Sequence, residues 1–204
     1  DNLVLRSAVC DLGVKHIISS KIEHHAVSHT IEALANSSKV RVSYVKVLKD
    51  GFVCMQHLEE LLSQSAEKTL VTLMHINNEI GTILDLEYVA NLCKKYAALF
   101  HSDTVQSVGH YPLDVSKIPI DFLAASAHKF HGPKGVGFAF VRSGFGLQPI
   151  ITGGTQERRC RAGTESIHDI VGMDASLEIA YKNINSETDY ILSLKTYFIK
   201  RLRE

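Results

Sequence analysis

Short apolar or β-branched runs alternate along the chain with longer segments in which apolar residues recur at every third or fourth position. The short runs have the length and composition of β-strands, and they occupy residues 16–19, 40–47, 69–76, 99–102 and 121–126. The longer segments have the period of amphipathic helices, and they cover residues 25–36, 55–64 and 86–97, with a further helical pattern from about 187 to 204. This alternation predicts an α/β fold with a mostly parallel sheet and helices on both faces.

Polar residues of interest follow several of the predicted strands. They are His24, Asn77, Asn78, Asp103 and the run from Ser126 to Lys129. Because parallel strands end at one edge of a sheet, and ligands bind at that edge in such folds, we expect these residues to lie together in a site. No repeat, low-complexity tract or linker rich in Gly, Pro or Ser divides the chain, so residues 1–204 are predicted to form one domain.

Composition narrows the range of functions. Lys and Arg together number 22, as do Asp and Glu, so no charge excess points to nucleic acid or to a polybasic membrane surface. The cysteines show no CxxC spacing, which favours neither a zinc knuckle nor a disulfide framework and indicates a reducing compartment. They are Cys10, Cys54, Cys93 and Cys160. No run is as long as a membrane helix and the first residues lack the layout of a signal peptide, so we expect a soluble protein.

The strongest local feature is Ser126-Ala127-His128-Lys129, followed by Gly132-Pro133-Lys134-Gly135. A lysine amine that acts as a nucleophile must be partly desolvated so that it can lose its proton and form a Schiff base. The hydroxyl of Ser126 and the imidazole of His128 suit an anionic phosphate beside it. A surface lysine at the end of a strand is the alternative interpretation of this motif.

Asp103 lies in the run His101-Ser102-Asp103, and Gln106 follows. A carboxylate that keeps the pyridine nitrogen of pyridoxal phosphate (PLP) protonated makes the ring an electron sink, and an aspartate at a strand end can do this. Asp103 could equally be a helix cap or a turn residue. Metal ligation by His101 and Asp103, with His24, His128 or His131 as further ligands, is a weaker alternative. These histidines lie in separate segments, and no paired spacing places two of them on one helix.

Three further segments carry candidate chemistry. His24, in Glu23-His24-His25, could lie over a pyridine face and relay protons, or belong to a helix cap. Asn78, in Asn77-Asn78-Glu79-Ile80-Gly81, could direct an amide at a phenolate or carboxylate, or form a plain turn. The basic loop at residues 153–165 combines glycines, arginines and Thr164 before a helix, which suits a phosphate or carboxylate, although a solvated charged loop has the same composition.

Taken in order, these segments resemble the class-V aminotransferase family, and within it the cysteine desulfurases of the NifS/IscS group. The resemblance rests on SSKIEHHAV, MHINNEIG, HSDTVQSVG, SAHKFHGPKGVG and GGTQERRCRAGTES, which begin at residues 19, 74, 101, 126 and 153. It implies the large domain of a PLP-dependent transferase of fold type I. It also implies conversion of L-cysteine to L-alanine, with the sulfur kept as an enzyme persulfide for iron–sulfur cluster assembly or another sulfur-delivery route.

The resemblance also assigns roles residue by residue. Lys129 would hold PLP covalently, Asp103 would pair with the pyridine nitrogen, and His24 would stack on the ring and shuttle protons. The other cofactor contacts it implies are Gln106 and Asn78 at the phenolate side, Ser126 and His128 at the phosphate, and Thr164 at the phosphate of the other subunit. The implied context is a cytoplasmic homodimer that works with a sulfur acceptor or scaffold protein, with no need for nucleic acid or a membrane.

Some features of the family have no counterpart here. The Ser-Gly-x-Thr-Glu phosphate loop would precede Asp1, and the nucleophilic cysteine and substrate-binding arginine belong to a C-terminal part beyond Glu204. We therefore expect a fragment that lacks the first phosphate loop and the small domain and does not turn over L-cysteine by itself. Cys160 is expected to be too constrained to attack substrate, and the other three cysteines to be buried and structural.

The rival hypotheses belong to different classes. A class-V aminotransferase or lyase acting on another amino acid would share most of these motifs. A fragment that only binds cofactor or a partner would also share them, and a metal-dependent hydrolase is a more distant alternative.

Overall fold

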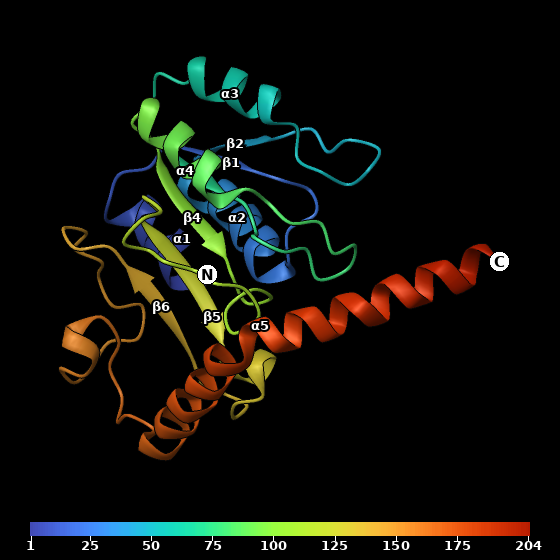
Figure 1. The fold of residues 1–204 in the computed structure, drawn as a ribbon. Coiled ribbons are helices and arrows are strands. Elements are labelled where there is room, and N and C mark those ends of the chain that lie inside the picture. Colours follow the sequence, from blue (N-terminus) through green and yellow to red (C-terminus); the bar gives the residue numbers. More distant parts are fainter.

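A six-stranded sheet forms the centre of the computed structural model, which describes all residues 1–204 (Figure 1). The strand order is β2-β1-β3-β4-β5-β6, with every neighbouring pair parallel except β5 and β6. The strands are β1 (His16–Ser19), β2 (Arg41–Tyr44), β3 (Thr69–Thr72), β4 (Leu99–Asp103), β5 (Phe122–Ser126) and β6 (Gly137–Val141). The mostly parallel α/β fold predicted from the sequence is confirmed.

Helices cover both faces of this sheet. They are α1 (Asn2–Cys10), α2 (His25–Ser38), α3 (Met55–Ser63), α4 (Leu86–Lys95) and α5 (Ile167–Arg203), with short 3₁₀ turns η1 (Ala127–Phe130) and η2 (Glu157–Arg159). Helices α1 and α2 contact each other on one face, and α3 and α4 on the other. Helix α5 packs against η1, and its C-terminal half extends away from the sheet (Figure 1).

Alternation along the central strands builds a separate core on each face. Ile17, Leu70 and Phe122 are fully buried against α1 and α2. Their sequence neighbours Ile18, Val71 and Leu123 are buried on the opposite face against α3 and α4. Successive side chains of a strand point to opposite faces, so strands buried on both sides read in the sequence as continuous apolar runs. This is why short apolar runs located these strands.

The largest differences from the predicted strand bounds occur at the ends of β2 and β3. Residues 45–47 leave β2 to form an antiparallel bridge between Val47 and Val53. The strand predicted at residues 69–76 ends at Thr72 in the structure. Beyond it, the His75 N–H still donates to the carbonyl of Asp103 at 2.9 Å. The chain therefore follows β4 almost to the end of the predicted run.

Two elements were not predicted. Helix α1 is a nine-residue helix whose apolar side chains face the core, and it was recognised only as an apolar segment. Strand β6 is one of the two edge strands, its side chains are at most half-buried, and it opens on a glycine. Its run Gly137-Phe138-Ala139-Phe140-Val141 is apolar throughout, so the sequence did carry a strand signal there, but the antiparallel pairing with β5 is visible only in the structure.

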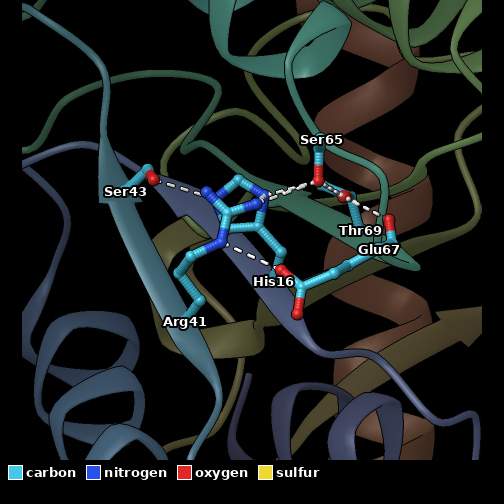
Figure 2. A network of polar contacts seen from close by, with 6 residues as sticks. All are labelled: His16, Arg41, Ser43, Ser65, Glu67 and Thr69. Atoms are coloured by element: carbon cyan, nitrogen blue, oxygen red, sulfur yellow. Dashed lines mark hydrogen bonds and ion pairs between the residues drawn. The ribbon is translucent and has the colours of Figure 1, made fainter.

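A closed polar network lies at the amino edge of the sheet, where β1, β2 and β3 begin (Figure 2). Nε2 of His16 lies 2.9 Å from Ser43 Oγ, and Nδ1 lies 2.8 Å from Ser65 Oγ and 3.0 Å from a guanidinium nitrogen of Arg41. Because a guanidinium only donates, Nδ1 must accept, which leaves the proton on Nε2. Burial, and then the charge of Arg41, lower the pKa of His16 to about 4.

The network closes through the neighbouring polar groups. Arg41 pairs with Glu67 at 2.9 Å, and Ser65 Oγ lies 2.8 Å from Thr69 Oγ1 (Figure 2). The parallel register, in which His16 is opposite both Arg41 and Thr69, brings these groups together. Each of them therefore has its partners within the chain.

Candidate active site

The carboxyl ends of four adjacent strands gather the residues predicted to form a site. His24 follows β1, Asn77 and Asn78 follow β3, Asp103 ends β4, and the Ser126–Lys129 run follows β5. These strands are neighbours and parallel, so their ends share one edge of the sheet. The chain leaves β1 for β2 on one side and returns to β3 on the other. The loops after β1 and β3 therefore flank the point where such folds bind ligands.

Lys129 lies on the tight turn η1, directly after β5. Ala127 and Phe130 anchor this turn because both are buried. The ring of His110 fixes the backbone, with Nε2 2.8 Å from the Lys129 carbonyl oxygen. Lys129 is half-buried and its amine takes part in none of the ion pairs of the chain. The structure thus presents an unpaired amine on a fixed backbone, as covalent attachment requires.

Ser126 and His128 flank Lys129 and contact each other, with 2.8 Å between Ser126 Oγ and His128 Nδ1. Ser126 is half-buried and His128 is exposed. The contact orients a hydroxyl and an imidazole beside the lysine. The structure therefore brings together all three residues predicted from this motif.

Asp103 is buried, with 4% of its surface exposed, at the last position of β4. Its Oδ1 accepts the Val105 N–H at 2.9 Å. The next residue, Thr104, donates its hydroxyl to the carbonyl of Ala124 at 2.8 Å, which ties the turn to β5. One carboxylate oxygen thus holds the turn and Oδ2 is left for another donor, as a protonated ring nitrogen would be. Gln106 follows on the same turn and is half-buried.

His24 caps the N-terminus of α2, where its Nδ1 accepts the Ala26 N–H at 3.1 Å. With Nδ1 accepting, the neutral ring carries its proton on Nε2. His25 does something different, because its ring stacks on that of His29, one turn further along α2, at a centroid distance of 4.6 Å. The cap interpretation and the cofactor interpretation of His24 are therefore compatible, since only one ring nitrogen is used.

The two asparagines of the Asn-Asn-Glu motif differ in their surroundings. Asn77 is buried, its Nδ2 donates to the Ile22 carbonyl at 2.7 Å, and its Oδ1 accepts the N–H groups of Glu79 and Ile80. Asn78 is exposed and its Nδ2 donates to Glu79 Oε1 at 2.8 Å. Asn77 thus builds the turn, and Asn78 lines a cavity of about 330 Å³ together with His24.

Glu23 is a buried site residue to which sequence reasoning gave no role. Its Oε1 accepts the Ser20 hydroxyl at 2.6 Å, and its Oε2 accepts the Met74 N–H at 2.8 Å. Burial raises the pKa of Glu23 to about 8, against the opposing effect of these two hydrogen bonds, and the charge of Asp103 raises it further. A strongly raised carboxyl pKa at a ligand-binding edge is typical of functional sites. The only signal in the sequence was its position beside His24.

The histidines behind the site are neutral. Complete burial, and then the nearby amino group of Asp1, lower the pKa of His101 to about 3, and burial lowers that of His75 to about 4. Nδ1 of His101 lies 2.9 Å from the Thr72 hydroxyl. Its Nε2 is 3.4 Å from the Asp1 carboxylate, in a geometry that makes no hydrogen bond. No group of three or more His, Cys, Asp or Glu side chains is placed to hold a metal ion.

Thr164 lies apart from these residues, in the exposed loop before α5. The loop contains three successive left-handed residues, Glu157, Arg158 and Arg159, a conformation that costs free energy at each non-glycine position. The Gln156 side chain closes it by accepting the Gly163 N–H at 3.1 Å. Thr164 makes no hydrogen bond within the chain to the other predicted site residues, so its role toward a second subunit stays a prediction.

The cysteines are placed less uniformly than expected. Cys93 is buried, and burial raises the pKa of its thiol well above the usual range. The expectation of a buried Cys10 is wrong, because it is the last residue of α1 and exposed there, and Cys54 is only half-buried at the N-cap of α3. Cys160 is half-buried and directly follows the three left-handed residues of the loop, and its being too constrained to attack substrate stays a prediction.

The residues at this edge fit PLP by their chemistry. An unpaired amine, a buried carboxylate with a free oxygen, and a hydroxyl–imidazole pair match the aldehyde, the ring nitrogen and the phosphate of that cofactor. No helix of the structure is both long and apolar enough to cross a membrane.

Comparisons with known proteins agree with this arrangement. The family model described as Aminotransferase class-V matches residues 2–204. The cysteine desulfurase IscS of Dictyoglomus turgidum is 39% identical over 100% of this chain and 52% of its own length. A solved NifS-like protein superposes with a TM-score of 0.93 at 36% identity, covering 99% of this chain and 56% of its own.

A second solved structure, described as SspA in complex with cysteine, has a TM-score of 0.81 at 35% identity, covering 87% of this chain and 51% of its own. The chain therefore spans about half the length of the relatives it matches. With a family match over nearly every residue and site residues at the predicted strand ends, the chain belongs to the class-V aminotransferase family.

Proposed function

We propose that this chain is the cofactor-binding core of a PLP-dependent cysteine desulfurase, which converts L-cysteine to L-alanine and retains the sulfur as a persulfide for delivery. The observation that carries the proposal is the convergence of Lys129, Asp103 and His24 at the carboxyl edge of one sheet. Similarity to proteins named cysteine desulfurase, and to a structure in complex with cysteine, supports the choice of substrate.

Each residue has a defined task in this proposal. Class-V aminotransferases use PLP, which when bound withdraws electrons from the substrate α-carbon. Lys129 attaches the cofactor. Asp103 holds a proton on the ring nitrogen through Oδ2, because Oδ1 is already bonded to the Val105 N–H. His24 covers the ring and presents Nε2, because Nδ1 is occupied by the helix cap.

The remaining candidates bind the cofactor's substituents. Ser126 and His128, in mutual contact, bind the phosphate. Gln106 and Asn78 approach the phenolate side, and Thr164 reaches the phosphate of a second subunit. In this proposal residues 1–204 form the large domain of a cytoplasmic homodimer that passes sulfur to an acceptor or scaffold protein, with no role for nucleic acid or a membrane.

By itself, this chain has no cysteine suited to complete desulfuration. Desulfuration needs a thiolate delivered to the substrate sulfur. Cys93 is buried with a raised pKa and Cys160 lies in a constrained loop. Cys10, although exposed, ends α1 with its backbone in the helix. The 204-residue chain should therefore not turn over L-cysteine by itself.

Absorption spectroscopy tests this function. The chain is saturated with PLP and its near-visible band is recorded before and after addition of L-cysteine, with L-alanine and L-aspartate as comparison amino acids. We expect L-cysteine to change the band, without multiple turnovers to alanine and sulfide. A band that responds to L-aspartate and not to L-cysteine would replace the desulfurase with an aminotransferase of the same family.

A further inference from the structure

Glu23 ties together two segments that carry site residues. It belongs to the segment from Ser20 to His24 after β1, and its Oε2 accepts the backbone N–H of Met74, which lies after β3. A second bond joins the same segments, from Asn77 Nδ2 to the Ile22 carbonyl at 2.7 Å. The position of His24 relative to the loop that carries Asn78 therefore depends on these two contacts.

Glu23 also stands between two cavities. The 330 Å³ cavity beside His24 and a second, mostly apolar cavity of about 460 Å³ share only Ile22, Glu23 and Asn77 among their lining residues. Glu23 is 8% exposed. Removing its side chain would open the cavity beside His24 toward the apolar cavity. It would also leave the Met74 N–H without its hydrogen-bond partner, which costs free energy.

We propose that Glu23 is a positioning residue of the cofactor site, whose carboxyl group fixes the His24 segment against the Met74–Ile80 loop and so holds the His24 ring where its Nδ1 caps α2 and its Nε2 keeps the proton. The inference rests on the proposed function, because it assumes that His24 lies over PLP. Glu23 itself touches neither cofactor nor substrate in this proposal. It acts through the next residue, His24, whose Nδ1 caps α2 by accepting the Ala26 N–H at 3.1 Å.

The hydrogen-bond pattern identifies the substitution that should preserve this role. The Glu23 carboxyl group accepts the Met74 N–H through Oε2 and the Ser20 hydroxyl through Oε1. Glutamine can keep both contacts, with its carbonyl oxygen accepting the Met74 N–H and its amide nitrogen donating to Ser20 Oγ, whose hydroxyl then turns its own proton away. Alanine removes both, and methionine fills the volume without accepting a strong hydrogen bond. Replacement of buried ionisable groups by apolar ones of similar volume is often tolerated, so the methionine variant guards against loss of folding.

The first arm of the experiment needs no cofactor. Nitrogen-15 histidine-labelled chain is studied by NMR, with the His24 signals assigned by their absence in His24→Ala. We expect the Nε2–H tautomer in the wild type and in Glu23→Gln, and ring signals shifted toward a mixture of tautomers in Glu23→Ala and Glu23→Met. Glu32→Ala is the matched control, because Glu32 is an exposed glutamate on the same helix that His24 caps.

The second arm measures the Kd for PLP. Glu23→Ala and Glu23→Met should weaken binding about tenfold, the effect of losing roughly one good hydrogen bond, and Glu23→Gln should stay within about twofold of the wild type. If the wild type binds no PLP, the proposed function fails while the NMR arm still decides the positioning role. His24 signals that are identical in the wild type, Glu23→Ala and Glu23→Met would overturn the inference even where PLP binds.

Discussion

At the amino edge of the sheet, His16, Arg41 and Thr69 begin three strands and are joined in one network, in which Arg41 contacts His16 and Ser65 connects both to Thr69. At the carboxyl edge His24, Asp103 and Lys129 lie at or after the ends of three strands and make no hydrogen bond to one another. The first group forms a closed network, in which the polar atoms find partners inside the chain (Figure 2). In the second group, the side chains of His24 and Asp103 each accept one hydrogen bond from the backbone. That bond fixes the side chain and leaves its other polar atom free. Closed networks stabilise a fold, and open ones are available to a ligand.

The largest effect should come from Asp103→Ala, which removes the free carboxylate oxygen at the carboxyl edge. In a full-length protein that carries this chain, we expect a loss on the order of several kcal/mol of transition-state stabilisation, as for other preorganised charge contacts. The free energy of unfolding should change much less. Turnover and urea unfolding of the same variant measure the two effects. Near-normal turnover with a normal cofactor spectrum would make Asp103 a turn residue only.

His16→Ala should show the opposite pattern, because His16 belongs to the closed network. The substitution leaves the Ser43 and Ser65 hydroxyls and Arg41 without their shared partner. We expect the free energy of unfolding to fall by about 2–4 kcal/mol, with the Kd for PLP unchanged once the protein is folded. Denaturant unfolding and PLP titration check this. A variant as stable as the wild type with weakened PLP binding would reverse the roles assigned to the two edges.

Changes of pH should separate the buried histidines from Glu23 by the sign of their effect on the free energy of unfolding. The pKa of His16 is lowered to about 4, so between about pH 6.5 and 4 the unfolded chain binds a proton that the folded chain refuses, and stability falls as the pH drops. His75 and His101 act in the same direction. The pKa of Glu23 is raised to about 8, so the folded chain keeps a proton that the unfolded chain loses above about pH 4.5, and stability falls as the pH rises toward 8.

Glu23→Gln isolates the second contribution. It removes the buried group that must ionise, so the variant should gain stability relative to the wild type between pH 6 and pH 9. Urea unfolding of both proteins at the two pH values provides the comparison. If the free energies of unfolding of the two proteins differ by the same amount at pH 6 and at pH 9, Glu23 does not titrate in this range.

His24 and His25 should respond differently although they are adjacent. His24 caps α2 through Nδ1 and presents Nε2, whereas His25 stacks on His29. His24→Ala should therefore shift the PLP absorption band, and His25→Ala should leave it nearly unchanged. Spectra of the two variants, saturated with PLP at equal protein concentration, make the test. A shift in His25→Ala alone would show that His25, and not His24, contacts the cofactor.

The sequence predicted the carboxyl edge better than the amino edge, for a physical reason. His24, Asp103 and Lys129 lie at the ends of apolar runs or within a few residues after them, so locating the strands located the site. The amino-edge network joins residues far apart in the chain, and only the register of β1 opposite Arg41 and Thr69 reveals it. The role of Glu23 was missed because its hydrogen bond to the Met74 N–H joins segments far apart in the chain, which no local pattern reports.

Reduction of the PLP-loaded chain with borohydride, followed by peptide mapping, tests the central claim that the carboxyl edge is a PLP site. The account predicts a pyridoxyl group on Lys129, which is half-buried on its anchored turn. Lys134, five positions later in the same motif and exposed, serves as the internal comparison. An adduct on Lys134 or another lysine, with Lys129 unmodified, would contradict the assignment.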